Sequence, residues 1–434
     1  QEGTPLFGAG GGTEEELKII SVMRLAHPDR LIPASLDVEG TEGLIPRLKA
    51  GANVVTSIVP PNTNLAGVAQ KDLDIDNGHR SVSIQQSRLQ QYDEEDEGRG
   101  YDCMILGIVG GALQGMEAVY LAHHAGYKTL LLDKRDDPPA ASMADSFMKL
   151  NPAKDPKTAK RILEGCDAVI PACEDTELLE ALNKMLSGSD TKLLFDMEAY
   201  RISSSKDRSN RMMGEIGVPM PQEWPACGYP AIVKPSSQSG SVGVAVAWSQ
   251  KDVSESMDRI LAMGDKPIIQ EFVSGKSLSV EVIGGDDPRS FALTEILLSS
   301  DYDCKMVRCS PHIADASVAA EMGELAERIS KHMGLKALMD LEAISTPKGL
   351  RVLEIDARIP SQTPAAVLAA TGMNMLEELV SRPGRAGRGG CSVYEHLHIK
   401  DGALITCGEK NFSKVSKPYL AHGLFGADEM ITDY

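Results

Sequence analysis

Residues 338–344 read LMDLEAI and residues 352–358 read VLEIDAR, and these two segments decide the fold. In each segment acidic residues alternate with apolar ones, which is typical of a half-buried β-strand. Because side chains alternate between the two faces of a strand, the acids of each segment share one face. Two neighbouring strands of this kind would present four carboxylates: Asp340, Glu342, Glu354 and Asp356.

Four facing carboxylates repel one another unless cations neutralise them. Hard oxygen ligands close to phosphate groups suit Mg²⁺, so we predict a magnesium site here. The alternative is a pair of half-exposed strands whose acids are solvated. Arg358 follows the second strand and can neutralise charge on a reacting phosphate. The next residues, IPSQTP, offer polar groups to a substrate through Ser361, Gln362 and Thr363.

A lysine-bearing strand and a loop of small residues lie upstream. Lys234 ends YPAIVKP, and PSSQSGSVGVA follows it over 235–245, including Ser239, Gly240 and Ser241. A fixed positive charge beside a flexible loop with free amides is what triphosphate binding needs. A surface lysine beside a turn is the alternative. The strand IIQEFVSG then supplies an apolar wall and an acid, Glu271, as an adenine pocket requires.

A second glycine-containing loop, ILGIVGGALQG over 105–115, lies between a predicted strand and a predicted helix. Its glycines allow backbone amides to approach a ligand at the helix start, and Asp133 follows on the next strand. This pattern indicates a dinucleotide or nucleotide site, with a nicotinamide-dependent redox enzyme as one interpretation. Glycines that merely allow close packing of strand and helix are the other.

The order of elements predicts an α/β protein in several parts. Strands at 102–111, 127–136 and 166–175 with intervening helices predict an open parallel sheet, whereas later strands look antiparallel. The polar, acidic stretch over 87–100 is a predicted linker. Before it, strands within 31–40 and 52–61 joined by a short helix predict the last part of a (β/α) barrel.

Composition limits the partners. The 434 residues carry 44 Lys+Arg and 62 Asp+Glu, and the net charge of −18 without a basic run argues against nucleic acid. No apolar stretch suits a membrane span, and the eight cysteines form no CxxC pair, so we expect a cytoplasmic protein whose cysteines are bystanders. The first residue is Gln1, so we expect a longer reading frame with another start.

The succession SSSK, VKP, the serine/glycine loop, QEFVSG and LEIDAR resembles the ATP-grasp superfamily of carboxylate–amine ligases. GGALQGMEAVYLA, LLDKR, FDMEAYRISSSK and LEIDARIPSQTP are similar to the pyrrolysine-pathway ligases that join 3-methylornithine to lysine. The resemblance covers 101–434 and includes the C-terminal VYEHLHIKDGAL and LFGADEMITDY. It implies a Rossmann-like domain that precedes the ATP-grasp domain over 101–200, and an ATP-grasp region with a closing segment over 201–434.

The N-terminal segments RLIPASLDVEG, GANVVTSIVPP and LAGVAQKDLDID resemble the end of radical-SAM methylornithine synthases. Residues 1–86 would then be a C-terminal fragment of such a barrel. The three-cysteine cluster motif of those enzymes does not occur, because the first cysteine is Cys103. We therefore expect a fusion of consecutive pathway enzymes whose first part is inactive.

The resemblance implies roles for individual residues. Lys206 and Lys234 would bind phosphates of ATP, and Glu271, Phe272 and Val273 the adenine. Magnesium would be held by Glu354 and Asp356, assisted by Asp340 or Glu342, with Arg358 and Lys234 catalytic. L-Lysine would be held by Leu113, Gln114 and Glu174. Ser277 stands where many ATP-grasp enzymes have a ribose-binding acid, so the ribose contacts depart from that pattern.

The implied reaction is ATP-dependent ligation of (3R)-3-methyl-D-ornithine to the ε-amine of L-lysine through an acyl phosphate, by a homodimer as in many such ligases. Another ATP-grasp amino-acid ligase or a purine-type carboxylase would share the architecture. A non-catalytic nucleotide-binding fusion product is the alternative from a different class. Composition and spacing do not separate these possibilities.

Overall fold

The computed structural model describes residues 13–26, 33–35, 46–47, 50, 52, 54–56, 104–300, 302–381, 384, 387–400, 403–412, 418–424 and 427–431. The chain divides into two compact units, one formed by residues 1–102 with 419–431 and the other by 103–418 with 432–434. The predicted linker over 87–100 lies outside the described residues. None of the described helices has both the length and the apolar character that crossing a bilayer requires.

The larger unit begins with a parallel sheet of five strands in the order β5-β4-β3-β6-β7, as the sequence predicted. Its core is apolar because strands such as β3 and β6 are buried on both faces. The sheet strands are β3 (Ile105–Val109), β4 (Lys128–Asp133), β5 (Ser146–Lys149), β6 (Ala168–Pro171) and β7 (Lys192–Leu193). The helices of this part are α4 (Leu113–His124), η1 (Pro139–Ser142), α5 (Pro156–Leu163) and α6 (Thr176–Leu186).

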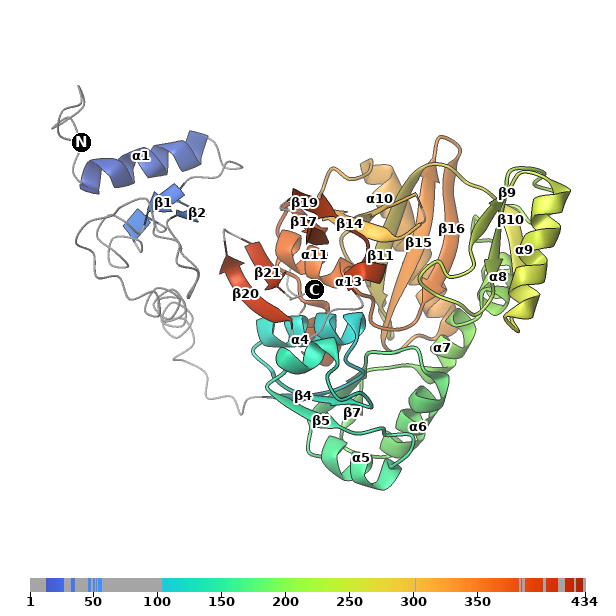
Figure 1. Cartoon of the computed structure of the whole chain (residues 1–434), viewed down its shortest axis with the longest axis horizontal. Coiled ribbons are helices and arrows are strands. Elements are labelled where there is room, and N and C mark those ends of the chain that lie inside the picture. Colours follow the sequence, from blue (N-terminus) through green and yellow to red (C-terminus); the bar gives the residue numbers. More distant parts are fainter. Residues whose placement is uncertain are drawn as a thin grey trace. The chain divides into compact units, whose positions relative to one another are not determined.

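Two short helices and a small antiparallel sheet follow, drawn in green and yellow in Figure 1. The sheet order is β10-β8-β9, with β8 central. Ser205 caps the second helix by accepting a hydrogen bond from the amide of Arg208, which fixes where that helix begins. The elements are α7 (Met197–Ser203), α8 (Lys206–Glu215), β8 (Ala231–Pro235), β9 (Ala245–Ala247), α9 (Gln250–Ala262) and β10 (Pro267–Glu271).

The largest sheet is antiparallel, with the path β16-β15-β11-β13-β14-β17 and β12 paired to β11. One face is covered by α10, and the two bury a core of aliphatic residues. The strands are β11 (Lys276–Ile283), β12 (Arg289–Ser290), β13 (Thr294–Leu298), β14 (Cys304–Cys309), β15 (Leu338–Thr346), β16 (Gly349–Asp356) and β17 (Ser392–Glu395). The remaining elements are α10 (Ala316–Met333), α11 (Thr363–Thr371), α12 (Met375–Ser381), β18 (Leu397–Lys400), β19 (Ala403–Thr406) and α13 (Glu409–Phe412).

The predicted antiparallel strands are all present in these two sheets. Alternation of apolar and polar residues located them correctly because each strand has one face against a helix or core. β15 and β16 pair antiparallel over nearly their whole length, with a register shift between Glu342 and Ala343.

The smaller unit contains α1 (Thr13–Ala26), β1 (Pro33–Ser35), β2 (Val54–Thr56), β20 (Tyr419–Leu424) and β21 (Ala427–Ile431). β1 and β2 pair in parallel, which agrees with the predicted β-α-β unit. Much of the predicted helix between them lies outside the described residues, although the amide of Ala50 donates to the carbonyl of Pro46 as in a helical turn. The side chain of Arg47 forms an ion pair with Glu16 at 2.7 Å.

Candidate active site

A cavity of about 1000 Å³ lies in the larger unit and is lined by all of the site residues that the sequence predicted. They come from the parallel sheet, the small sheet and the large sheet. The predicted lining residues are Leu113, Gln114, Asp133, Glu174, Lys206, Lys234, Ser239, Gly240, Ser241, Glu271, Phe272, Val273, Asp340, Glu342, Glu354, Asp356, Arg358, Ser361, Gln362 and Thr363.

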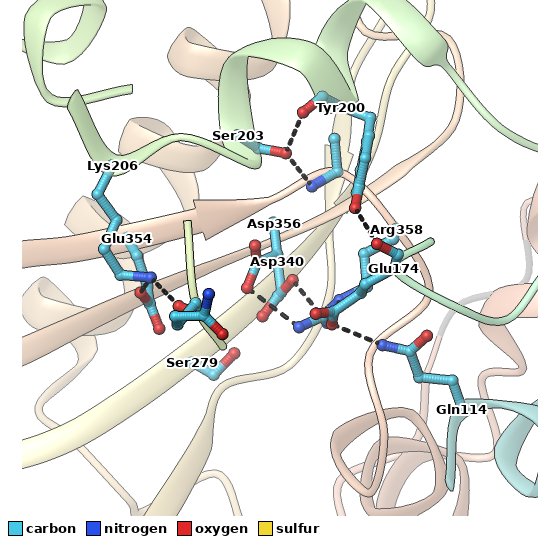
Figure 2. Close-up of polar contacts among 12 residues, drawn as sticks. Gln114, Glu174, Tyr200, Ser203, Lys206, Ser279, Asp340, Glu354, Asp356 and Arg358 are labelled. Carbon is cyan, nitrogen blue, oxygen red and sulfur yellow. Dashed lines mark hydrogen bonds and ion pairs between the residues drawn. The ribbon is translucent and has the colours of Figure 1, made fainter. Parts of the chain in front are cut away.

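The four acids of β15 and β16 lie side by side. The strand register places Asp340 opposite Asp356 and Glu342 opposite Glu354, so all four face the same side of the sheet. Figure 2 shows three of them with the cationic side chains that they contact. The predicted arrangement of facing carboxylates is therefore present.

Burial and mutual repulsion change the charge of this cluster. Burial raises the pKa of Asp340 to about 7 and that of Asp356 to about 8, although Arg358 opposes both changes. Burial and the neighbouring acids raise the pKa of Glu342 well above its usual value. Burial also acts on Glu354, but Lys206 and Lys234 outweigh it and lower the pKa of this acid. Glu354 is therefore the acid that carries a full negative charge.

The two predicted phosphate-binding lysines flank Glu354. The ammonium of Lys206 lies 2.9 Å from Oε2 of Glu354 and donates to the carbonyl oxygen of Gln238 at 2.8 Å. The ammonium of Lys234 donates to the carbonyl oxygen of Leu353 at 3.3 Å. Burial lowers the pKa of Lys234, because its side chain is almost fully enclosed at the end of β8. Both positive charges thus face the cavity from elements next to β16.

The serine/glycine loop that the sequence predicted to be a flexible flap follows β8 and lines the cavity. Gly240 and Ser241 have φ values of 60° and 58°, which lie in the left-handed region. A side chain at Gly240 would meet no atom within 4 Å, so the loop there is open. The hydroxyl of Ser241 donates to the carbonyl oxygen of Tyr302 at 2.9 Å, which ties the flap to the large sheet's side of the cavity.

The predicted adenine wall lies at the end of β10. The backbone of Glu271 donates to the carbonyl oxygen of Gln222, and the amide of Gln222 donates to the Glu271 carboxylate at 3.3 Å. The amide of Phe272 donates to the carbonyl of Pro230. Ser277, at the position of the missing ribose-binding acid, also lines the cavity.

Arg358 connects the large sheet to the parallel sheet. Its guanidinium lies 3.0 Å from Glu174, 3.1 Å from Asp356 and 3.7 Å from Asp340. Gln114, at the start of α4, donates to the same Glu174 oxygen at 3.0 Å (Figure 2). Burial opposes the charge of Arg358, but these acids raise its pKa well above the usual value. Glu174 therefore carries its negative charge beside a fixed cation.

Asp133, which the sequence predicted to bind the cofactor, lines the cavity and is engaged by the protein itself. Its carboxylate accepts hydrogen bonds from the amide of Gly111 at 2.7 Å and from the backbone and guanidinium of Arg135. Burial opposes ionisation, but these donors lower the pKa of Asp133. Both oxygens are thus engaged by the protein, so the carboxylate holds the glycine loop. Cofactor binding by Asp133 stays a prediction.

The predicted polar substrate loop contains a backbone outlier. Gln362 has a φ of 75° and is buried, with 3% of its surface exposed. Its amide donates to Glu409 at 2.9 Å and accepts from the thiol of Cys304 at 3.1 Å. Ser361 and Thr363 line the cavity on either side of it.

Several polar residues of the site were missed by the sequence reasoning. The hydroxyl of Tyr200 donates to the carbonyl of Glu174, and Ser203 accepts from the amide of Ala357, which fixes the chain just before Arg358. Glu281 lies opposite Asp340 on β11 and is fully buried. Alternation within β11 could have indicated Glu281, whereas the other contacts join residues more than 20 positions apart and have no local signal.

The predicted magnesium ligands fit a divalent cation in chemistry but are not gathered around one point. Within the described ranges, no three His, Cys, Asp or Glu side chains converge closely enough to hold a metal ion. Glu354 contacts Lys206 instead, and Asp356 contacts Arg358. The buried Oδ1 of Asp340 has no hydrogen-bond donor, which a hard cation would supply.

Comparison with known proteins agrees with this architecture. A family model for the ATP-grasp domain matches residues 203–362. A 3-methyl-D-ornithine–L-lysine ligase of Methanosarcina mazei is 37% identical over 332 residues, which cover 73% of this chain and 84% of that protein. The chain belongs to this family of ATP-grasp ligases.

Two further comparisons concern the fold and a shorter stretch of the chain. The crystal structure of an N5-carboxyaminoimidazole ribonucleotide synthetase with ADP has a TM-score of 0.57 and 20% identity, covering 67% of this ligase chain and 80% of the other. A 3-methylornithine synthase of Methanosarcina barkeri is 54% identical over 91 residues, which are 21% of this chain and 26% of that protein. The ligase is thus an enzyme that forms a C–N bond with ATP, and it includes a stretch similar to a synthase.

Proposed function

We propose that this ligase uses ATP to join the carboxylate of 3-methyl-D-ornithine to the ε-amine of L-lysine, in pyrrolysine biosynthesis. The observation that carries the proposal is the single cavity in which Lys206, Lys234 and Arg358 surround four acids on β15 and β16. The Methanosarcina mazei relative that bears these two substrates in its name aligns over most of both chains. Acid activation by ATP followed by amine attack needs this combination of cations and acids.

The nucleotide would occupy the part of the cavity between the small and the large sheet. Lys206 and Lys234 would neutralise the phosphates, and the flap over 239–241 would supply backbone amides. Glu271, Phe272 and Val273 would form the wall for adenine. Glu354 and Asp356, with Asp340 or Glu342, would hold magnesium, which when bound neutralises charge on the transferring phosphoryl group.

Chemistry would proceed in two steps. A carboxylate oxygen of 3-methyl-D-ornithine attacks the γ-phosphorus of ATP, and the bond to the bridging oxygen of ADP breaks. The uncharged ε-amine of lysine then attacks the acyl carbon, phosphate leaves, and the nitrogen loses a proton. Arg358 would stabilise charge on the carbonyl oxygen and the acyl phosphate, and its ion pairs with Glu174 and Asp356 support this role because they fix the guanidinium in the cavity. No covalent enzyme intermediate is required.

Lysine would bind beside the parallel sheet. Leu113 and Gln114 begin α4, and Glu174 lies in the loop that follows β6, where ligands of parallel sheets bind. The carboxylate of Glu174 accepts from Gln114 and Arg358 through its Oε1. Its other oxygen would accept from the α-ammonium of lysine.

We also infer that residues 1–86 are related to the C-terminal part of methylornithine synthases. The identity of 54% over 91 residues supports this relation, as does the parallel pairing of β1 and β2. The proposed boundaries of the ligase are then 101–200 for the Rossmann-like domain and 201–434 for the ATP-grasp region.

Product analysis tests the proposed function. The full chain is incubated with ATP, Mg²⁺, L-lysine and either D-ornithine or 3-methyl-D-ornithine, and products are separated by mass. The proposal predicts one amide and one ADP per turnover, dependent on both amino acids. ADP release without an amide would favour another ATP-grasp reaction, and ATP binding without ADP release would favour a non-catalytic nucleotide-binding protein.

A further inference from the structure

The cavity contains more acids than the nucleotide site uses. Ten carboxylates and six lysine or arginine side chains line it, an excess of four acids. Arg135, Lys134, Lys206 and Arg358 are each paired with one or more of these acids. A cavity with surplus carboxyl groups suits ligands that bring positive charge, such as metal ions and substrate ammonium groups, because a cation favours the ionised form of a nearby acid.

Glu409 is a surplus acid with a fixed position. It is the first residue of α13, and its Oε2 accepts a hydrogen bond from the side-chain amide of Gln362 at 2.9 Å. Across the described part of the chain, no lysine, arginine or histidine forms an ion pair with Glu409 within 4 Å. Burial raises the pKa of Glu409, although Arg358 opposes this from a greater distance. A cation next to its free oxygen would restore the charged form.

Gln362 is held so that its amino group faces Glu409. The thiol of Cys304 donates to Oε1 of Gln362 at 3.1 Å, and this contact leaves the NH₂ group for the acid. Burial raises the pKa of Cys304 to about 12, so the thiol stays protonated and remains a donor at neutral pH. Strained backbone conformations cluster at functional sites, where the surrounding contacts hold them, and Gln362 is a non-glycine residue at a φ of 75°.

The loop that carries Gln362 is anchored from the parallel sheet's side. Glu117, which lies on α4 and is buried, accepts from the amide of Ala365 at 2.6 Å at the start of α11. The segment 361–365 is thus held by contacts from three elements. These contacts come from Cys304 on β14, Glu117 on α4 and Glu409 on α13. Such support from three elements is what a precise binding contact requires.

We propose that Glu409, oriented by Gln362, binds the distal ammonium of the diamino acid whose carboxylate is activated. This inference rests on the proposed function and adds a residue that selects the substrate. The reacting carboxylate must lie near Arg358, which contacts Glu174, Asp356 and Asp340 but not Glu409. An α-ammonium lies next to its carboxylate, whereas the distal ammonium lies several bonds away. Glu409 lines the same cavity and is influenced by the charge of Arg358 without contacting it, so it can serve the distal group.

Paired substrates test this assignment. D-Ornithine and D-norvaline have the same carbon chain, and only the first has a distal amine. In Glu409→Gln, we expect the KM for D-ornithine to rise about 10- to 100-fold, the range for a lost hydrogen bond to a charged group. The kcat/KM for D-norvaline, or its inhibition constant against D-ornithine if turnover is slow, should change less than about threefold. The KM for lysine should not change.

A matched control and a second variant exclude a general structural effect. Glu324→Gln makes the same chemical change on the exposed side of α10 and should alter no constant. Gln362→Leu leaves the acid in place but removes its donor, and should give a smaller loss that is again selective for D-ornithine. Thermal unfolding of each variant verifies that it is folded.

Three outcomes would overturn the inference. Equal losses for D-ornithine and D-norvaline would make Glu409 a structural residue. A raised KM for lysine alone would assign Glu409 to the other substrate. If the unmodified protein forms an amide from neither amino acid, the proposed function fails, and the assignment of Glu409 fails with it. In the first two cases amide formation by the unmodified protein shows that the proposed function stands.

Discussion

Two glycine-containing loops line the same cavity, and they differ in what their glycines do. In the loop after β3, a Cβ at Gly115 would lie 2.2 Å from the carbonyl oxygen of Gly110, and one at Gly110 would lie 2.5 Å from that of Ala172. In the loop after β8, a Cβ at Gly240 would meet nothing within 4 Å. The first loop therefore needs glycine for packing, and the second needs it for backbone freedom.

The acids beside the two loops differ in the same way. Asp133 directs both carboxylate oxygens to Gly111 and Arg135, so it stabilises the first loop. Beside the second loop, Glu354 contacts Lys206 at 2.9 Å and is influenced by the charge of Lys234, and all three side chains line the cavity. A glycine pattern followed by an acid thus has the same appearance in sequence whether it serves packing or ligand binding. We expect substitutions at the first loop to change stability and those around the second to change catalysis.

The largest expected effect is on the catalytic side, in Lys234→Met. Methionine keeps the volume but removes the buried charge, so kcat/KM should fall about 100- to 1000-fold, as when one preorganised electrostatic donor is lost. Stability should change little, because burial penalises the charge of Lys234 and Glu354 keeps its ion pair with Lys206. Steady-state kinetics and thermal unfolding measure the two effects. Lys251→Met, on the exposed side of α9, is the control, and full activity in Lys234→Met would remove this residue from catalysis.

Gly115→Ala should lower stability and leave nucleotide binding unchanged, the reverse of what Lys234→Met should do. The added methyl group collides with the backbone of Gly110, and overpacking of this kind costs about 1–3 kcal/mol of unfolding free energy. Denaturant unfolding measures the loss, while the KM for ATP of the folded protein should stay the same. Gly214→Ala in α8 is the matched control, because its nearest neighbour is a methionine methyl at 3.5 Å. Unchanged stability in Gly115→Ala would contradict the packing role.

The pH dependence of stability in Asp133→Asn tests whether the charge of this carboxylate stabilises the first loop. The native contacts lower the pKa of Asp133 below its unfolded value, so its ionised form contributes stability above that value. The substitution should cost about 1–3 kcal/mol near pH 7, the range for a hydrogen bond to a charged group. The difference from the unmodified protein should begin to shrink as the pH falls below about 4, where the acid protonates in the unfolded state, and should be lost below its lowered native pKa, where it is protonated in both states. A difference in stability that is constant with pH would show that the carboxylate charge does not matter.

The smallest expected effect is that of Gly240→Ala. Its φ of 60° disfavours alanine by about 1–2 kcal/mol, and the open flap can relax without unfolding. A free-energy cost of about 1–2 kcal/mol corresponds to a rise in the KM for ATP of about 5- to 30-fold. The unfolding temperature should change little. Gly264→Ala has the same kind of backbone conformation outside the cavity and should not change the KM for ATP. An unchanged KM in Gly240→Ala would mean that the flap does not close over the nucleotide.

The strands could be predicted because each has local alternation, and the facing acids followed from strand parity. Glu117 and Glu409 escaped prediction because their partners are brought together by contacts between distant elements, whereas alternation within β11 could have indicated Glu281. Asp133 was assigned to a cofactor because its sequence context is the same in either role. The pairing of Glu354 with Lys206 depends on side-chain conformation, which no sequence pattern encodes.

Transfer of an oxygen isotope from the substrate to phosphate tests most directly whether the enzyme activates the carboxylate through an acyl phosphate. D-Ornithine labelled with ¹⁸O in its carboxylate is converted with ATP and lysine, and the released phosphate is analysed by mass spectrometry. Activation through an acyl phosphate predicts one ¹⁸O atom in each phosphate, because the carboxylate oxygen that attacks phosphorus leaves with it. Amide formation with unlabelled phosphate would contradict the account.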